Sequence, residues 1–214
     1  MPSATWIRIV ILLAAATMFL ASLLTGDSID ELGLRWLTGI IGLVTALIVL
    51  FDLRLWRLPG VWQLLELTTG FRKARGTWHG TLEYDRDENG DPGSQEIYLV
   101  VHQTFSQVSV NCFFPSRDSM SWSKIAKFET IDHRHLIRYL YQQEAPTTDR
   151  DVNRPTEGAC TLDLIGRPVR EIKGSYYSER GGKGKIELTR HSPRTAASFR
   201  QAKALDYQDL EHSN

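Results

Sequence analysis

Cysteine is scarce in this sequence of 214 residues, which contains only Cys112 and Cys160. The two are far apart and form neither a Cys-x-x-Cys motif nor a Cys/His pattern with the spacing of a zinc site. The sequence therefore predicts neither a disulfide framework nor a metal centre. We expect both thiols to be buried in a protein of a reducing compartment.

Net charge is also absent, because 25 Lys and Arg residues balance 25 Asp and Glu residues. A neutral chain produces no broad electrostatic field that would attract a long polyanion. We therefore expect no nucleic-acid polymer among the partners. An anionic ligand would have to be held by a local site.

The motifs of the common catalytic and nucleotide-binding sites are missing. The sequence has no Gly-x-Ser-x-Gly, no P-loop and no Gly-x-Gly-x-x-Gly between a strand and a helix. The six histidines are scattered, and His133 and His135 have no third metal ligand nearby in sequence. We therefore expect no catalytic residues, no metal and no cofactor, and hence a protein that is not an enzyme.

Charged residues are missing from two N-terminal stretches, between Arg8 and Asp27 and from Trp36 to Phe51. The sequence predicts transmembrane helices over residues 7–25 and 34–53, within an N-terminal hairpin of residues 1–58. Arginine and lysine flank the hairpin while acidic residues lie in its loop, which predicts that both termini are cytoplasmic. A cleaved signal peptide is the alternative for the first run. Residues 59–75 are predicted to form an interfacial linker.

From Gly76 onward the hydrophobic pattern changes to a period of two, with turn residues at regular intervals. Residues 76–191 are predicted to form an all-β domain, an eight-stranded antiparallel up-and-down β-barrel that removes exposed sheet edges by closing. Residues 192–214 are predicted to be a polar tail, frayed or marginally helical. The strands are expected near 77–84, 96–103, 107–114, 121–130, 135–142, 158–165, 169–177 and 185–190.

Aromatic and basic residues gather around the last predicted hairpin. Stacking rings beside cationic groups suit a nucleobase joined to a phosphate, although an ordinary barrel rim has the same composition. The glycines of Gly181-Gly-Lys-Gly184 suit either an anion or a plain turn. A Trp in the first strand of a barrel, here Trp78, usually fills one end. The residues of the hairpin group are Tyr176, Tyr177, Arg180, Lys183, Lys185 and Arg190.

The order of several motifs resembles the two-transmembrane, β-strand-rich effectors of bacterial CBASS anti-phage systems, a SMODS-associated family of cyclic-dinucleotide receptors. The resemblance covers nearly the whole chain. Its motifs are Trp78-His-Gly80, Tyr98-Leu-Val-Val-His-Gln103, Ser119-Met-Ser-Trp-Ser123, Leu140-Tyr-Gln, Gly174-Ser-Tyr-Tyr-Ser-Glu-Arg180 and Gly184-Lys-Ile-Glu-Leu188.

The resemblance implies a β-barrel that binds a cyclic dinucleotide made by a CD-NTase-type nucleotidyltransferase. It further implies a homo-oligomer on activation, located in the bacterial inner membrane, which disrupts that membrane and causes cell death. Aromatic side chains are expected to stack on the bases and arginines to meet the phosphates. The candidate ligand-binding residues are Tyr177 and Arg180, followed by Trp78, Tyr139, Tyr141, Ser121 and Arg190.

Two other readings of the barrel remain open. Gly76-Thr-Trp78 at the head of the first strand also resembles the opening of lipocalins, which suggests a membrane-tethered barrel for an apolar small molecule. A lipid carrier needs an almost wholly apolar interior, whereas a nucleotide receptor needs arginines and hydroxyl groups inside. A third reading is a structural barrel that binds only another protein and whose interior is filled by side chains.

Overall fold

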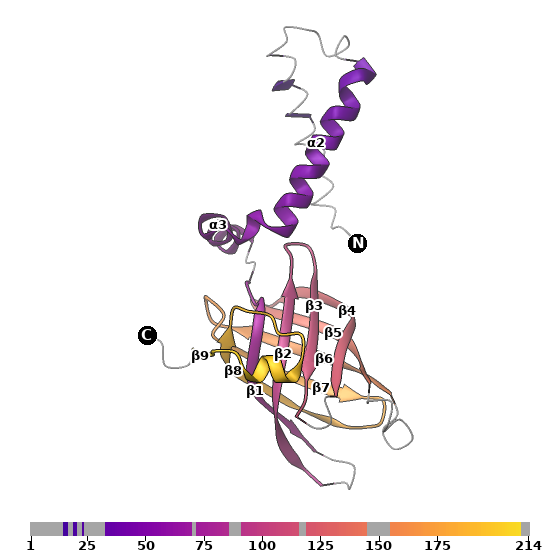
Figure 1. The fold of residues 1–214 in the computed structure, drawn as a ribbon, viewed down its shortest axis with the longest axis vertical. Coiled ribbons are helices and arrows are strands. Elements are labelled where there is room, and N and C mark those ends of the chain that lie inside the picture. The colour runs from indigo at the N-terminus through magenta and orange to yellow at the C-terminus, as the bar shows by residue number, and fades with distance from the viewer. Residues whose placement is uncertain are drawn as a thin grey trace. The chain divides into compact units, whose positions relative to one another are not determined.

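The computed structural model describes residues 15–16, 19–20, 23, 33–69, 72–85, 91–115, 119–144 and 155–210 (Figure 1). The chain divides into two compact units. One is formed by Met1–Leu67 with Thr104–Ser106, and the other by Thr68–Gln103 with Gln107–Asn214. The described part of the first unit is mostly helical, and the second unit is a β-barrel.

The helical unit contains α2 (Gly33–Leu53), the 3-10 helix η1 (Leu55–Arg57) and α3 (Pro59–Thr69). Helix α2 covers the second predicted run, residues 34–53, whereas most of the first, residues 7–25, lies outside the described residues. Proline suits the start of α3, since the first position of a helix needs no amide hydrogen. Within the described part of the chain, no helix combines the length and the apolar character that crossing a membrane requires.

Eight antiparallel strands form the barrel, each paired with the next one in sequence. Strand β1 also pairs with β8, from Thr77 opposite Ser192 to Tyr84 opposite Gly184, and this closes the sheet. The predicted eight-stranded antiparallel barrel is thereby confirmed, with every strand limit within three residues of the prediction. The strands are β1 (Gly76–Tyr84), β2 (Gly93–Gln103), β3 (Val108–Phe113), β4 (Met120–Ile131), β5 (Arg134–Glu144), β6 (Thr156–Ile165), β7 (Glu171–Ser178) and β8 (Lys183–Ser192).

The barrel interior is packed by the inward-facing residues of all eight strands. On β2, Ile97, Leu99 and Val101 alternate along the inner face and are completely buried, because successive side chains of a strand point to opposite faces. The pairing register shifts once between β4 and β5 and once between β1 and β8. After each shift, the inward-facing residues of one strand change between even-numbered and odd-numbered positions. Alternation alone therefore does not show which residues point inward.

The chain after β8 packs on the outside of the barrel, which corrects the prediction of a frayed or marginally helical tail. We call Pro193–Leu210 the C-terminal strap. It contains α4 (Phe199–Lys203) and the short strand β9 (Gln208–Asp209), which pairs with β8. Figure 1 shows the strap in yellow across the outer face of β1 and β2.

A second apolar cluster holds the strap in place. Ala196 and Ala202 of the strap are buried together with Tyr98 and Val100, which face outward from β2. Thr77 adds two hydrogen bonds, since its hydroxyl donates to the Arg194 carbonyl at 2.7 Å and accepts from the Ala196 amide at 3.1 Å. The uninterrupted apolar run of β2 is explained by this arrangement, because the strand is buried on both faces.

Candidate functional site

The two ends of the barrel interior are chemically different. We call the end where residues 72–75 enter the linker end. The opposite end, where β1–β2, β3–β4, β5–β6 and β7–β8 are connected, is the loop end. Because strands alternate in direction, the last residues of the odd-numbered strands and the first residues of the even-numbered strands lie near the loop end.

Trp78 fills the linker end. Its side chain is 1% exposed, its indole nitrogen donates to the Ala74 carbonyl at 2.8 Å, and its ring lies 4.4 Å from that of His191. The imidazole of His191 bonds to the Arg75 carbonyl at 3.1 Å, and burial lowers the pKa of this histidine, which favours the neutral ring. Gln103 satisfies two further backbone groups, accepting from the Ala74 amide and donating to the Arg72 carbonyl.

Tyr139 and the two cysteines form a buried layer in the middle of the barrel. All three side chains are buried, as expected for Cys112 and Cys160. The Tyr139 hydroxyl bonds to Cys160, and burial raises the pKa of Tyr139 well above its usual value and that of Cys160 to about 12. Both groups are therefore uncharged at neutral pH, which makes the thiols poor nucleophiles.

Tyrosine and glycine alternate across four neighbouring strands at the loop end. Tyr176 of β7 lies opposite Gly184 of β8, which lies opposite Tyr84 of β1, which in turn lies opposite Gly93 of β2. Each ring lies against the glycine beside it. A Cβ atom would come within 2.7 Å of the Tyr84 hydroxyl if built on Gly93, and within 2.7 Å of the Tyr176 ring if built on Gly184. At Gly93 the missing side chain makes room for the Tyr84 ring, whereas at Gly184 a Cβ would first meet the Glu83 carbonyl oxygen at 1.8 Å.

A third ring is placed in the same way on β5. Tyr141 lies opposite Gly158 of β6, and a Cβ on that glycine would be 2.5 Å from the ring. The Tyr141 hydroxyl donates to the carbonyl of Tyr177 at 3.3 Å. Burial raises the pKa of Tyr141, and it raises that of Tyr176 to about 12 with further contributions from Asp85 and Tyr84. The phenols therefore stay protonated and remain hydrogen-bond donors at neutral pH.

Polar side chains form a second part of this end. Ser121 of β4 lies opposite Gln143 of β5, which lies opposite Thr156 of β6. Ser121 and Thr156 are buried, and the Thr156 hydroxyl has no hydrogen-bond partner among the described residues. A buried hydroxyl without a partner carries a free-energy cost that a ligand could relieve. The loop end thus combines flat aromatic surfaces with hydroxyl and amide groups.

The structure separates the sequence-predicted site residues into three groups. Tyr141 and Ser121 lie in the barrel interior toward the loop end and Tyr139 lies in the middle layer, whereas Trp78 is interior but at the linker end. Tyr177 is 65% exposed on the outer face, and Arg190 is exposed on the outer face beside β9. Arg180 is exposed in the turn after β7, on the rim of the loop end.

Sequence reasoning left four residues of this end out of the candidate set: Tyr84, Tyr176, Gln143 and Thr156. Tyr176 and Tyr177 are adjacent, so one of them must face inward, and the alternation of β7 with buried Ile172 assigns that place to Tyr176. The sequence signal that could have identified the tyrosines of this end is the set of strand glycines Gly93, Gly158 and Gly184. A glycine inside a strand often marks a place where another group approaches closely.

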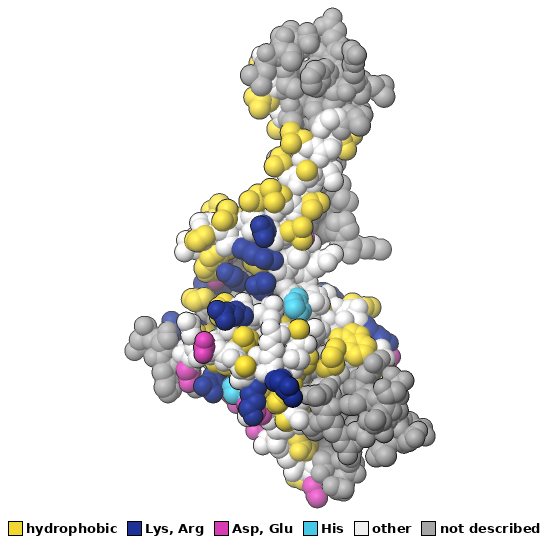
Figure 2. Space-filling model, viewed as in Figure 1, with side chains coloured by type: hydrophobic (Ala, Val, Ile, Leu, Met, Phe, Trp, Pro, Cys, Tyr) yellow, Lys and Arg dark blue, Asp and Glu magenta, His cyan; other side chains and the backbone are white. Residues whose placement is uncertain are grey.

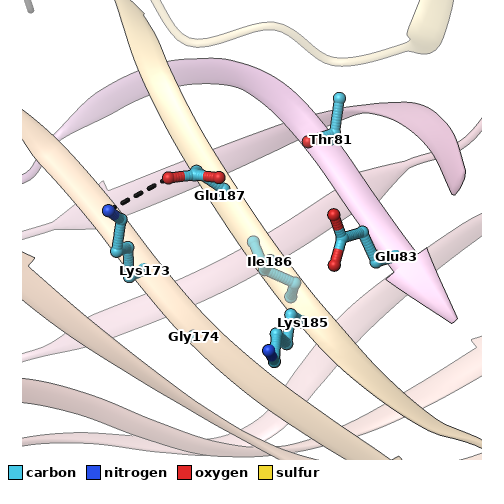
Figure 3. A pocket seen from close by; sticks show the side chains of 7 residues that line it. All are labelled: Thr81, Glu83, Lys173, Gly174, Lys185, Ile186 and Glu187. Carbon is cyan, nitrogen blue, oxygen red and sulfur yellow. Dashed lines mark ion pairs between the residues drawn. The ribbon is translucent and has the colours of Figure 1, made fainter.

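A shallow groove of about 190 Å³ lies elsewhere, on the outer face of β1, β7 and β8. Figure 3 shows its charged side chains, with Lys173 paired to Glu187 at 3.0 Å. Opposite charges alternate along this groove, so it offers no concentrated positive charge for a phosphate. Among the described residues there is no group of three or more His, Cys, Asp or Glu side chains placed to hold a metal ion.

Comparison with known proteins agrees with the geometry of the barrel. The family model described as "Cap15, cyclic dinucleotide receptor domain" matches residues 71–190, which is more than half of the chain. No curated protein matches the sequence significantly. The match covers β1 to β7 and β8 as far as Arg190. The chain therefore belongs to the Cap15 family of cyclic-dinucleotide receptor domains, which are CBASS effectors.

Proposed function

We propose that the loop end of the barrel holds the cyclic dinucleotide, with its bases against the tyrosine rings. The observation that carries this proposal is the alternation of Tyr176, Gly184, Tyr84 and Gly93 on neighbouring strands. A tyrosine ring offers a flat face, and every nucleobase has a flat face to stack on it. Tyr141, against Gly158, adds a ring on the other side of Tyr176.

The polar row of this end supplies the groups that distinguish one base from another. The Gln143 amide both donates and accepts, and Ser121 and Thr156 add hydroxyl groups on either side of it. Thr156 is the member whose hydroxyl lacks a partner among the described residues. A base edge that bonds to it would satisfy a buried polar group, and such contacts give strong discrimination.

Positive charge for the two phosphates would come from the rim, where the Lys183 ammonium lies 3.9 Å from an Asp85 carboxylate oxygen. Arg180 and Lys183 lie in and just after the turn that joins β7 to β8, close in sequence to Tyr176. A guanidinium group suits a phosphate because it donates two parallel hydrogen bonds. Arg180 therefore keeps its proposed role as a phosphate ligand, whereas Tyr177 and Arg190 point away from the interior.

The alternative of a lipocalin-like carrier for an apolar molecule is less well supported. Such a carrier needs an interior that is apolar throughout, and here Ser121, Gln143 and Thr156 line the loop end. The arginine that a nucleotide receptor requires lies at the rim and not inside. The family match also favours the nucleotide.

We further propose that the helical unit anchors the receptor in the bacterial inner membrane with both termini in the cytoplasm. Ligand binding then drives self-association and disruption of the membrane, and cell death follows. Two uncharged sequence runs support the anchor. So do the apolar side chains exposed along the described part of α2, which include Ile41, Leu43, Leu47 and Leu50 (Figure 2). A nucleotidyltransferase encoded nearby would supply the ligand.

Calorimetry on the purified full-length chain tests the site, with cyclic di-AMP, cyclic di-GMP and cyclic GMP–AMP as probes. Loss of one stacked ring costs about 1–3 kcal/mol, so Tyr176→Ala is expected to weaken binding about 5- to 150-fold. Tyr177→Ala is the matched control, because the neighbouring ring faces outward and its loss is expected to leave affinity unchanged. If the wild-type chain bound none of the three probes, the proposal would be contradicted. A loss confined to Tyr177→Ala would restore the assignment predicted from the sequence.

A further inference from the structure

The seams between neighbouring strands of the barrel differ in length. Between β3 and β4, only Asn111–Phe113 pair with Met120–Trp122. Every other seam of the barrel joins at least six residue pairs, and the seam between β4 and β5 joins eleven. Beyond Trp122, β4 continues to Ile131 with strand pairing on its β5 side alone, within the part of the chain that the structure describes. We call the contact between β3 and β4 the short seam.

A side chain takes the place of the backbone where this pairing ends. The next residues in register are Val110 and Ser123, and there the Val110 amide donates to the Ser123 hydroxyl at 2.9 Å. The register between β4 and β5 shifts directly afterwards, between Ser123 and Ile125. A bulge of this kind bends its strand and often ends a pairing. The short seam therefore stops where β4 bends.

Apolar side chains close the rest of the short seam. Val108 and Val110 of β3 are buried in the interior cluster, and Ala126 and Phe128 of β4 pack against that cluster. Apolar contacts have no preferred direction, whereas backbone hydrogen bonds need a narrow range of distance and angle. Two strands held mainly by apolar contacts can therefore change their spacing at a lower cost than two strands held by a full ladder. Local opening is favoured where the fewest interactions must break.

The strands on either side of the short seam are held firmly to their other neighbours. Six residue pairs join β3 to β2, and the strap covers Val100 of β2 together with Phe113 of β3. Eleven pairs join β4 to β5, where Glu129 also pairs with Arg138 at 2.9 Å. Met120 of β4 packs at the margin of the strap cluster and is only partly buried. Opening of the short seam would therefore separate β2 and β3, as one body, from β4 and β5.

The short seam borders the proposed ligand site. Ser121 of β4 lies opposite Cys112 across the seam and opposite Gln143 on its other side. The polar row that continues from Gln143 to Thr156 therefore begins at the short seam. Separation of β3 from β4 would expose the first member of this row to an incoming molecule.

The barrel interior leaves little space for a ligand while all its seams are closed. An eight-stranded barrel is just wide enough to be filled by its own side chains or to hold one small ligand. Inward-facing residues of all eight strands pack together in this interior. A cyclic dinucleotide carries two nucleosides, so strands must move apart to admit it.

We infer that the barrel opens along the short seam to admit its ligand. In this step β3 and β4 move apart and the Val110–Ser123 hydrogen bond breaks, while the other seven seams keep their register. The inference rests on the proposed function, because it concerns the route to the same site. It predicts that the seam opens transiently without ligand and that binding requires this opening.

Hydrogen exchange of the full-length chain, measured without nucleotide, tests the transient opening. Mass spectrometry with residue-level fragmentation gives the rate of each amide. We expect the amides that donate across the short seam, that of Val110 among them, to exchange at least ten times faster than those that donate across the seam between β6 and β7. Equal protection of the two sets would overturn the inference.

A reversible lock tests whether binding requires the opening. Asn111 and Trp122 lie opposite each other on the outer face, since their neighbours Cys112 and Ser121 face inward. Asn111→Cys/Trp122→Cys can therefore form a disulfide across the short seam without entering the interior. In calorimetry with cyclic di-AMP, cyclic di-GMP and cyclic GMP–AMP, we expect the oxidised variant to bind at least ten-fold more weakly than the same variant reduced with dithiothreitol. Equal affinity in both states would show that the ligand enters with the seam closed, which overturns the inference.

The matched control locks β3 to its other neighbour. His102 of β2 lies opposite Ser109 of β3, and both are exposed. His102→Cys/Ser109→Cys is expected to bind with the same affinity, within two-fold, when oxidised and when reduced. The natural Cys112 and Cys160 are buried and compete little for either disulfide. If no probe binds the wild-type chain, the proposed site fails, while the exchange rates still support or overturn the opening of the seam.

Discussion

The two ends of the barrel interior place aromatic rings in different surroundings. At the linker end, Trp78 and His191 stack and their ring nitrogens bond to backbone carbonyls of the entering chain. At the loop end, tyrosine rings lie against glycines and the Thr156 hydroxyl has no partner among the described residues. Hydrogen-bonded groups stabilise the fold, whereas a buried hydroxyl without a partner carries a cost that the proposed ligand would relieve. If the proposed site is correct, stability and recognition are separated along the barrel axis.

The largest effect is expected at the linker end. Trp78→Ala removes a completely packed indole and is expected to lower the free energy of unfolding by about 3–5 kcal/mol. Urea unfolding followed by circular dichroism measures the loss. Trp122→Ala is the matched control on β4, where the tryptophan is only partly buried, and a smaller loss is expected. If Trp78→Ala and Trp122→Ala lowered the free energy of unfolding equally, the linker end would not be more important for stability than the rest of the barrel.

An intermediate effect is expected at the loop end. On Gly93, the three atoms nearest to an added methyl group all belong to the Tyr84 side chain, at 2.7 to 2.9 Å. Gly93→Ala is therefore expected to displace that ring and to cost about 1–3 kcal/mol of unfolding free energy.

In the Tyr84→Ala background the same change is expected to be neutral or slightly stabilising, because alanine loses less conformational entropy than glycine. A double-mutant cycle measures the difference between the two backgrounds. Additive effects of Gly93→Ala and Tyr84→Ala would show that the glycine does not position the ring.

The smallest effect concerns pH. Burial lowers the pKa of His191 below the ordinary value of 6.5, so below that pH the unfolded chain binds a proton more readily than the folded chain does. The free energy of unfolding is therefore constant above about pH 6.5 for this group and falls as the pH decreases toward the folded pKa. His191→Phe keeps a ring beside Trp78 and is expected to flatten this slope in urea titrations. An unchanged slope would assign the pH dependence to other groups.

The sequence predicted the barrel well because the signals for it are local. Alternation and turn residues define each strand, and pairing of neighbours follows from the short connections. The packing of the strap on the outer face of the barrel could not be predicted in the same way. Its alanines Ala196 and Ala202 become apolar contacts only when the outer face of β2 is known.

Assignment of the site was limited by the register of the strands. Tyr176 and Tyr177 have the same composition signal, and only the position of Ile172 inside the barrel shows which one faces inward. Arg190 lies beyond the register shift between β1 and β8, which places it on the outer face. A shift of one residue moves every later side chain to the other face. The interior positions of Tyr139, Tyr141 and Ser121 agree with the sequence-based set, and their contact with a ligand remains a prediction.

Closure of the barrel between β1 and β8 also fixes an order of events during synthesis. The hydrogen bond from Thr77 to Arg194 joins residues 117 apart, and contacts of such long range form late. Helices α2 and α3 are complete in the nascent chain before β1 has been made, and β1 lacks its last partner until β8 follows. Each molecule therefore exists for a time as helices without a closed barrel, and a chain that ends before Lys183 stays in that state.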